Sequence, residues 1–283
     1  MRARQSSRPG CTVPQLNEGG RARIARRSPP VGVSVLKSLF RSKRAAAPSI
    51  PAGARVYAIG DVHGCADQLD RLLAALDADD AARAPAATTL ILLGDLTDRG
   101  PDSRRVVERV MALAAASPRV TLIKGNHEEM LLRAAEGHRP SLQLFNRYGG
   151  RETLLSYGVD EAAYDEASLE ELGDAIAAHV PASHRAFLDA GVDHVSVGDY
   201  LFVHAGIRPG LPLAEQVGAD LRWIRDPFLS HRGAHEGFVI HGHTITAEPD
   251  VRTNRIGIDT GAYAGGPLTA IGLEGEDRWF LTA

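Results

Sequence analysis

Residues 88–100 read TTLILLGDLTDRG, an apolar run that leads directly into two acidic residues and an arginine. The apolar part is typical of a buried strand that ends at a glycine turn. The strand therefore delivers Asp95, Asp98 and Arg99 together to the place where it leaves the sheet. A single acid at such a position could be a surface residue, but two acids with an arginine between glycines indicate a functional site.

The segments on either side of this stretch predict an α/β fold. Before it, an apolar run at 55–59 precedes leucines at helical spacing over 69–76, and after it a second helical pattern leads to a third apolar run at 119–124. This β-α-β-α-β order predicts neighbouring parallel strands with helices packed on the sheet. Residues 127–190 look mainly helical, and strand-like runs dominate from residue 192 onward. We expect two mixed sheets with outer helices, without an internal repeat or a clear second domain.

The charge of the chain is distributed unevenly. Residues 1–50 contain 11 of the 32 Lys and Arg residues but one of the 35 Asp and Glu residues, which leaves 21 basic and 34 acidic residues in 51–283. We expect a basic, disordered N-terminal tail over 1–50, because it has little apolar surface to bury, and a folded domain over 51–283.

The apolar run at 31–40 is short and contains a lysine, so we expect no membrane span. The two cysteines, Cys11 and Cys65, cannot form a disulfide framework, and a cytoplasmic location is expected.

Five of the apolar runs end alike, at small residues mixed with carboxylate, amide or imidazole side chains. The five ends are Gly60-Asp61-Val62-His63-Gly64, Gly94-Asp95, Gly125-Asn126-His127-Glu128, His204-Ala205-Gly206 and His241-Gly242-His243-Thr244. Sites in α/β proteins gather at the carboxyl ends of strands, so we expect these ends to converge. Any one of them has an ordinary explanation, such as Asn126 acting as a helix cap. Such explanations would have to coincide at all five ends.

The side chains at these ends define a metal chemistry. Carboxylate, imidazole and amide ligands without a thiolate suit borderline-to-hard divalent ions such as Mn, Fe or Zn in a catalytic site. Six such ligands are too many for one open catalytic ion, but they suit two ions that share a carboxylate. The six are Asp61, His63, Asp95, Asn126, His204 and His243. On spacing alone, His241 is an alternative to His243.

The same motifs resemble the metal-dependent phosphoprotein phosphatases within the calcineurin-like metallophosphoesterases. The matching motifs are GDVHG at 60–64, GDLTDRG at 94–100, GNHE at 125–128, HAG at 204–206 and GHT at 242–244. Their order and spacing are similar to the compact bacterial and phage branch, and the resemblance covers about residues 54–283. It implies the calcineurin-like fold, an α/β fold in which two mixed β-sheets are sandwiched between helices (αββα). It also implies a hydrolase of phosphoric esters that uses two divalent ions, with Mn expected and Fe or Zn as alternatives.

Carried over position by position, the resemblance divides the six ligands between the two ions and makes Asp95 the bridge. The first ion would be held by Asp61 and His63, and the second by Asn126, His204 and His243. A hydroxide shared by the ions would attack phosphorus in line.

The resemblance also explains why the opening stretch carries two acids and an arginine. Asp98 would hydrogen-bond His127 and keep it protonated as a general acid. Arg99 and Arg225, together with Asn126, would bind the phosphate, since a forked guanidinium matches phosphoryl oxygens. For Arg225, a salt bridge to the adjacent Asp226 is the alternative.

The resemblance leaves the substrate open. Asp98 favours the phosphomonoesterase branch, so we expect a Ser/Thr protein phosphatase that acts on phosphoproteins or small phosphoesters. The alternative is a dinucleoside polyphosphate hydrolase acting on diadenosine tetraphosphate, because LTDRGPDS at 96–103 is compatible with asymmetric nucleotide hydrolases of this branch. A third hypothesis, a nucleic-acid-binding protein or nuclease that uses the basic tail, is disfavoured by the acidic domain. We expect the helical segment at about 138–190 to wall the site, and a monomer is compatible with the sequence.

Overall fold

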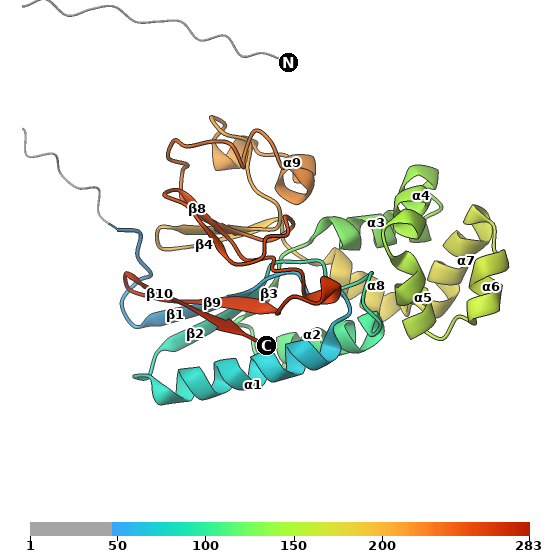
Figure 1. Ribbon diagram of the computed structural model, residues 1–283, viewed down its shortest axis with the longest axis horizontal. Helices are drawn as coiled ribbons and strands as arrows, with labels where there is room; N and C mark the ends of the chain where they lie inside the picture. Colours follow the sequence, from blue (N-terminus) through green and yellow to red (C-terminus); the bar gives the residue numbers. More distant parts are fainter. Residues whose placement is uncertain (1–46) are drawn as a thin grey trace, which may run out of the picture. The chain divides into compact units, whose positions relative to one another are not determined.

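The computed structural model describes residues 47–283, in which ten strands form two five-stranded sheets (Figure 1). The first sheet has the order β10 (Asp277–Thr282), β9 (Thr269–Glu274), β1 (Ala54–Ile59), β2 (Ala87–Leu92) and β3 (Val120–Leu122). The second has the order β4 (His194–Val197), β5 (Tyr200–Val203), β6 (Phe238–His241), β8 (Arg255–Gly257) and β7 (Asp250–Val251). The strands β1 to β3 run in parallel, as do β5, β6 and β8, and the remaining pairs are antiparallel.

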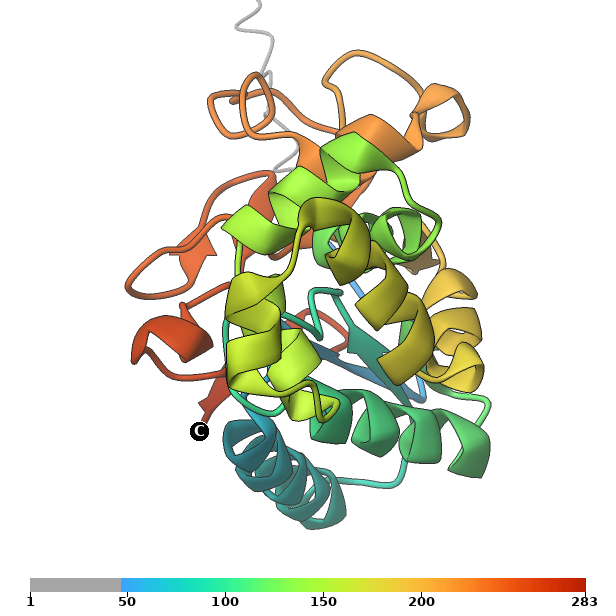
Figure 2. The ribbon, with the colours of Figure 1, turned by 90° about the vertical axis from the view of Figure 1, so that its right-hand side faces the viewer.

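The described residues also form nine α-helices. They are α1 (Ala66–Ala82), α2 (Ser103–Ala116), α3 (Asn126–Ala135), α4 (Arg139–Arg147), α5 (Gly150–Ser156), α6 (Glu161–Glu166), α7 (Leu169–His179), α8 (Ala182–Asp189) and α9 (Gly218–Trp223). The helices α4 to α8 form the expected helical segment, and in Figure 2 they gather in front of the sheets. Within 47–283 we find no helix that combines the length and the apolar character needed to cross a bilayer.

Alternate residues of the central strands face different layers, because successive side chains of a strand point to opposite faces. On β1, Tyr57 packs with the residues of α1 and α2, whereas Val56 packs with the residues of the second sheet. On β5, Phe202 belongs to this core between the sheets, whereas Val203 packs with the residues of α9. The layers therefore run helix, sheet, sheet, helix (Figure 1), which confirms the predicted arrangement of two mixed sheets between helices.

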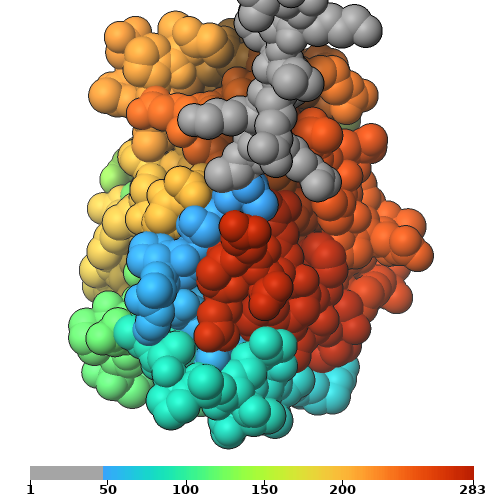
Figure 3. Space-filling view, turned by 90° about the vertical axis from the view of Figure 1, so that its left-hand side faces the viewer, coloured from blue at the N-terminus to red at the C-terminus, as the bar shows by residue number. Residues whose placement is uncertain are grey.

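The predicted N-terminal tail, residues 1–50, lies almost wholly outside the described residues, so its disorder stays a prediction. Its last residues do belong to the packed domain. Ile50 is 2% exposed, and its N–H donates to the Gly275 carbonyl oxygen at 2.8 Å. Ser49 donates to the Asp199 carboxylate through its N–H and its hydroxyl. This first described segment lies beside the C-terminal strands (Figure 3), and the packed domain begins slightly before the predicted boundary at residue 51.

Candidate metal centre

Parallel pairing brings the five predicted strand ends to one place. β1 to β3 run in parallel in the first sheet, and β5 and β6 run in parallel in the second. The residues that follow the carboxyl ends of these strands are Asp61, His63, Asp95, Asn126, His204 and His243. All six side chains are buried, so a polar cluster lies inside the domain where the sheets end.

Asp95 lies at the middle of this cluster. Its Oδ2 atom is 3.5 Å from His63 Nε2 and 3.4 Å from His204 Nε2. Two groups of candidate ligand atoms share this carboxylate, and within each group the atoms lie within 4.8 Å of one another. The groups are His63, Asp95 and His127, and Asp95, His204 and His243. A carboxylate common to both groups has the position expected of a bridge between two ions.

Asp61 lies at the edge of the cluster. Its Oδ2 atom is 4.0 Å from His63 Nε2, and both of its oxygens accept from the His243 N–H at 3.1 Å. The structure therefore brings together Asp61 and His63, the residues predicted to share an ion. The first group of ligand atoms nevertheless takes His127 as its third member rather than Asp61.

Backbone carbonyl groups orient two of the histidines. His63 Nδ1 donates to the Thr97 carbonyl oxygen at 2.8 Å, and His204 Nδ1 donates to the Leu93 carbonyl oxygen at 2.7 Å. Each of these bonds leaves Nε2 of the ring directed toward Asp95. Metal-binding histidines are commonly held in this way, because the hydrogen bond fixes both the tautomer and the ring.

His243, rather than its neighbour His241, belongs to the cluster. His243 Nδ1 and His204 Nε2 lie 2.8 Å and 2.9 Å from the Asn126 side-chain oxygen. His241 Nδ1 instead bonds a neighbouring backbone carbonyl oxygen, and its Nε2 accepts from Arg255 at 3.1 Å. Both ring nitrogens of His241 are therefore occupied, and this residue is not placed to join the group.

The charge balance of the cluster fits divalent cations. Burial raises the pKa of Asp61 well above its ordinary value, and the charge of Asp259 adds to this effect. Burial would also raise the pKa of Asp95, but the surrounding histidines lower it well below its usual range. Burial would lower the pKa of His204, but the charge of Asp95 raises it to about 10. His243 Nε2 and Asp259 Oδ2 are buried without a hydrogen-bond partner among the described residues. Divalent ions compensate buried carboxylates and bind deprotonated imidazoles, so the residues present fit such ions.

The backbone conformation is unusual at several of the same residues. Five non-glycine residues in the described chain have a positive φ, and all five are predicted site residues. They are His63 at 44°, Asp95 at 51°, Asp98 at 72°, Arg99 at 70° and His243 at 64°. A left-handed conformation costs a residue with a Cβ atom about 1–2 kcal/mol. Such strain persists where surrounding contacts fix it, and it clusters at functional sites.

Asp98 and His127 form a buried pair beside the cluster. His127 Nδ1 donates to Asp98 Oδ2 at 2.6 Å, and the Thr153 hydroxyl donates to Asp98 Oδ1 at 2.6 Å. Burial would lower the pKa of His127, but the charge of Asp95 and the bond to Asp98 raise it above its ordinary value. The structure thus brings together the two residues predicted to act as an acid and its support.

Arg99 lies against the cluster. Its Nη1 atom donates to His63 Nε2 at 3.0 Å, and its guanidinium lies 4.7 Å from the centre of the Tyr263 ring. The Arg99 N–H donates to the Gly149 carbonyl oxygen at 2.9 Å, which ties this turn to the helical segment. The guanidinium of Arg99 is therefore held beside the candidate ligand atoms.

Arg225 is exposed. Burial and then the charge of His204 lower the pKa of His243 to about 2, and Arg225 contributes to the same shift. The alternative ion pair of Arg225 with Asp226 is not formed in residues 47–283. The side chain of Arg225 is therefore exposed and has no ion pair among the described residues.

Two buried acids were missed as site residues. Glu128 accepts backbone N–H groups from Gly125, Asp95 and Leu96 at 2.9, 2.8 and 2.7 Å, and it thereby holds the loop that carries Asp95. A Glu at the third position after a strand-ending glycine is a signal that could have found it, because this position faces the start of the helix. Asp259 is the other acid, and its charge contributes to the raised pKa of Asp61. Asp259 is far from Asp61 in sequence, so no local pattern relates the two residues.

Comparisons with known proteins agree with this geometry. A family model described as calcineurin-like phosphoesterase matches residues 54–262. The chain is 36% identical over 181 residues to the symmetrical bis(5′-nucleosyl)-tetraphosphatase of Acidovorax sp. (strain JS42), a match that covers 64% of this chain and 50% of that relative. The chain thus spans about half the length of this relative. It is 28% identical over 235 residues to the asymmetrical bis(5′-nucleosyl)-tetraphosphatase PrpE of Bacillus velezensis, which covers 75% of this chain and 86% of that relative.

Solved structures share the fold. A structure described as a candidate diadenosine tetraphosphatase has a TM-score of 0.58 at 21% identity and covers 84% of this chain and 99% of that chain. A mutant of a cold-active protein tyrosine phosphatase has a TM-score of 0.52 at 17% identity and covers 83% of each chain. At such identities the likeness concerns the fold alone. The family model, in contrast, spans the chain from β1 through all five strand ends. The chain belongs to the calcineurin-like phosphoesterase family, as its motifs predicted.

Proposed function

We propose that this hydrolase cleaves dinucleoside polyphosphates, with diadenosine tetraphosphate as a representative substrate. The observation that carries the proposal is the match to the asymmetrical tetraphosphatase of Bacillus velezensis, which extends over 86% of that relative. It favours the alternative drawn from the sequence over the first expectation, a Ser/Thr protein phosphatase. A buried centre with an acid pair and two arginines supports either substrate, and the relatives favour the dinucleoside polyphosphate.

The metal ligands are part of the proposal. Asp95 is the proposed bridge, because its Oδ2 atom faces both His63 and His204. The ligands of two divalent ions would be Asp61 and His63 on one side and Asn126, His204 and His243 on the other, with Mn expected and Fe or Zn as alternatives. When bound, such ions neutralise phosphate charge and lower the pKa of a water molecule, so that a nucleophile is available near neutral pH.

The remaining residues bind the polyphosphate and move a proton. Arg99, Arg225 and Asn126 offer N–H donors to the phosphoryl oxygens around the reacting phosphorus. Water attacks that phosphorus in line, and the P–O bond to the leaving nucleotide breaks. His127, held protonated by Asp98 at 2.6 Å, donates its proton to the departing oxygen.

Product analysis tests the proposal. The full chain is incubated with Mn²⁺ and diadenosine tetraphosphate in ¹⁸O-labelled water, and the products are separated and weighed by mass spectrometry. We expect adenosine triphosphate and adenosine monophosphate, with one ¹⁸O atom incorporated per cleavage. The reason is that the relative matched over 86% of its length is an asymmetrical tetraphosphatase. Two diphosphates would indicate the symmetrical reaction instead. Absence of cleavage by a preparation that hydrolyses p-nitrophenyl phosphate would overturn the proposal, and an Asp95→Ala preparation controls for contaminating hydrolases.

Ser/Thr protein phosphatase activity is the second candidate function. The buried Asp98–His127 pair favours it, because an acid is most needed when a poorly stabilised alkoxide leaves. A phosphoserine peptide in the same assay decides between the candidates, since a higher kcat/KM on the peptide would reverse their order. Both functions fit the proposed cytoplasmic location. The nuclease hypothesis depends on the basic tail, and all of its Lys and Arg residues lie outside the described residues.

A further inference from the structure

We propose that a cavity beside the metal centre binds one purine nucleoside of the substrate. The cavity lies between α3, α4 and α9 and has a volume of about 360 Å³. The inference rests on the proposed function, because it states which part of a dinucleoside polyphosphate occupies the cavity. Small-molecule pockets measure about 300–1,000 Å³, so a cavity at the lower end suits a single nucleoside.

The cavity begins one helical turn from the proposed metal ligands. Glu129 and Met130 line it, and both lie on α3, whose first residue is Asn126. With a rise of 1.5 Å per residue, Met130 is about 6 Å along the helix axis from Asn126. Trp223 of α9 also lines the cavity, and it precedes Arg225 by two residues. A nucleotide whose phosphate is held by Asn126 and Arg225 can therefore place its nucleoside in the cavity.

Trp223 supplies a fixed aromatic surface for a base. Its Nε1–H donates to Glu129 Oε2 at 2.9 Å, and Arg222 Nε donates to the same oxygen at 3.0 Å. Burial would raise the pKa of Glu129, but these two hydrogen bonds lower it below its ordinary value, so the carboxylate stays ionised and holds the ring. A ring that is already held loses little freedom when a base stacks on it. Met130 and Leu144 extend the apolar lining.

A chain of polar groups on α3 and α4 leaves a hydrogen-bond donor in the cavity. Arg133 Nη2 lies 3.2 Å from His138 Nε2, and this nitrogen must accept because a guanidinium only donates. His138 Nδ1 then carries the hydrogen and donates to Ser141 Oγ at 2.9 Å. The hydroxyl hydrogen of Ser141 therefore stays free for a ligand. The ring nitrogens of a purine are acceptors for such a donor, and the two fused rings offer a larger face to Trp223 than a pyrimidine does.

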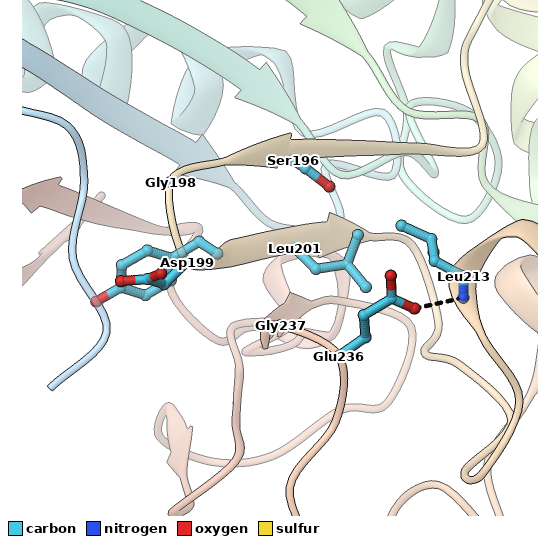
Figure 4. Close-up of a pocket in the computed structure, with 8 residues that line it drawn as sticks. Ser196, Gly198, Asp199, Leu201, Leu213, Glu236 and Gly237 are labelled. Atoms are coloured by element: carbon cyan, nitrogen blue, oxygen red, sulfur yellow. Dashed lines mark hydrogen bonds between the residues drawn. The ribbon is translucent and has the colours of Figure 1, made fainter. Parts of the chain in front are cut away.

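Another cavity lacks this relation to the metal centre. It has a volume of about 190 Å³, and Asp199 and Glu236 are among its lining residues (Figure 4). Glu236 accepts from the Leu213 N–H at 2.6 Å. Asp199 directly precedes β5, and Glu236 lies two residues before β6, so this cavity is at the amino ends of strands whose carboxyl ends carry the histidines. Its position and its acidic residues both disfavour a polyphosphate.

Tryptophan fluorescence tests binding directly. The chain contains two tryptophans, so the variant Trp279→Phe leaves Trp223 as the only one. The full chain with this substitution is titrated with adenosine 5′-monophosphate in the presence of Mn²⁺. Ribose 5-phosphate and uridine 5′-monophosphate serve as comparisons. We expect saturable quenching by the adenine nucleotide, weaker quenching by the uridine nucleotide and none by ribose 5-phosphate. Equal responses to all three, or none to the adenine nucleotide, would overturn the proposal.

Steady-state kinetics test the same cavity through the reaction. Stacking of a base on an aromatic side chain contributes about 1–3 kcal/mol, so Trp223→Leu should lower kcat/KM for diadenosine tetraphosphate relative to p-nitrophenyl phosphate by about 5- to 150-fold. Trp223→Phe keeps an aromatic face without the N–H and should retain most of this ratio. Trp279→Phe is the matched control and should not change it. An unchanged ratio in Trp223→Leu, or equal losses in the Leu and Phe variants, would mean that the ring supports Glu129 rather than a base.

The two assays separate a failure of this cavity from a failure of the proposed function. Quenching by adenosine 5′-monophosphate in a protein that does not cleave diadenosine tetraphosphate would support the nucleoside site and contradict the proposed function. Cleavage without quenching, together with an unchanged ratio of the two kcat/KM values in Trp223→Leu, would support the proposed function and contradict the nucleoside site.

Discussion

Replacing Asp98 with Asn tests the acid pair, because it removes a charge while keeping the shape of the side chain. Asp98 is fully buried, its Oδ2 atom lies 2.6 Å from His127 Nδ1, and its Oδ1 atom accepts from Thr153. Burial lowers the pKa of His127, and the charge of Asp95 and the bond to Asp98 raise it, so loss of the carboxylate should shift this pKa downward. A neutral ring that keeps its hydrogen at Nδ1 has no proton to give at Nε2. General acid catalysis contributes about 10²- to 10⁴-fold, which corresponds to about 2.7–5.4 kcal/mol.

The size of the loss in Asp98→Asn should depend on the leaving group. An alkoxide needs a proton as it departs, so turnover of an alkyl phosphate should fall by about 10²- to 10⁴-fold. A departing nucleotide phosphate has a pKa of about 6, so diadenosine tetraphosphate should lose about tenfold or less. Both rates are measured at saturating substrate, and metal content is measured on the same preparations to show that the centre is intact. Unchanged turnover of the alkyl phosphate, or equal losses on both substrates with the metal retained, would refute the assignment of His127 as the acid.

Four further predictions concern metal content and stability. Asp95→Ala should lose bound metal as measured by mass spectrometry, and two ions per chain in this variant would exclude a bridging role. Glu128→Gln removes an acceptor from buried backbone N–H groups and should cost about 2–3 kcal/mol, or roughly 4–12 °C in Tm, whereas a wild-type Tm would contradict the role of Glu128. Burial would raise the pKa of Asp79, but hydrogen bonds from three side chains lower it below its ordinary value. Ionised Asp79 therefore stabilises the folded state above about pH 4, the pKa of an Asp in the unfolded chain. This stability is lost as the pH falls through the lower pKa of the folded state. Urea unfolding of Asp79→Asn should therefore show a flatter acid limb than the wild type, and parallel limbs would dismiss the effect. Arg99→Gly should melt roughly 1–4 °C above Arg99→Ala, since a φ of 70° strains only a residue with a Cβ atom, and equal Tm values would argue against strain.

The sheets and the strand ends could be predicted because their signals are local. An apolar run, a glycine turn and a polar residue occur together within a few positions, as at Gly94 and Asp95, and parallel pairing then carries such ends to one edge. The same reasoning chose the residues that the structure brings together around Asp95. It could not choose between His241 and His243 without the resemblance, because both follow one strand and only the partners of each ring distinguish them.

Other features depend on contacts between distant segments, which no local pattern encodes. The cavity beside α3 exists because Trp223 of α9 meets Glu129, and nothing around either residue in the sequence indicates that contact. The packing of Ile50 against Gly275 likewise joins the two ends of the domain, and it moves the domain boundary into a segment whose composition resembles the tail. The sequence left two substrate classes open for a related reason. Asp98 favours the phosphomonoesterase branch, whereas LTDRGPDS at 96–103 is compatible with nucleotide hydrolases, and the walls of the site are built from separate helices.

The sequence motifs and the backbone strain have one physical cause. Side chains from separate strands that meet in one buried cluster cannot all leave their strands in preferred conformations, and five predicted site residues adopt a left-handed backbone. Each such residue costs about 1–2 kcal/mol, which is a large fraction of the 5–15 kcal/mol that stabilises a typical domain. Glycines at neighbouring positions, such as Gly94 with a φ of 100°, absorb part of the turn, and Glu128 fixes the remainder through three backbone N–H groups. The motif around Asp95 therefore determines the backbone conformation as well as the chemistry, because the same short segment supplies both the proposed ligand and the turn that orients it.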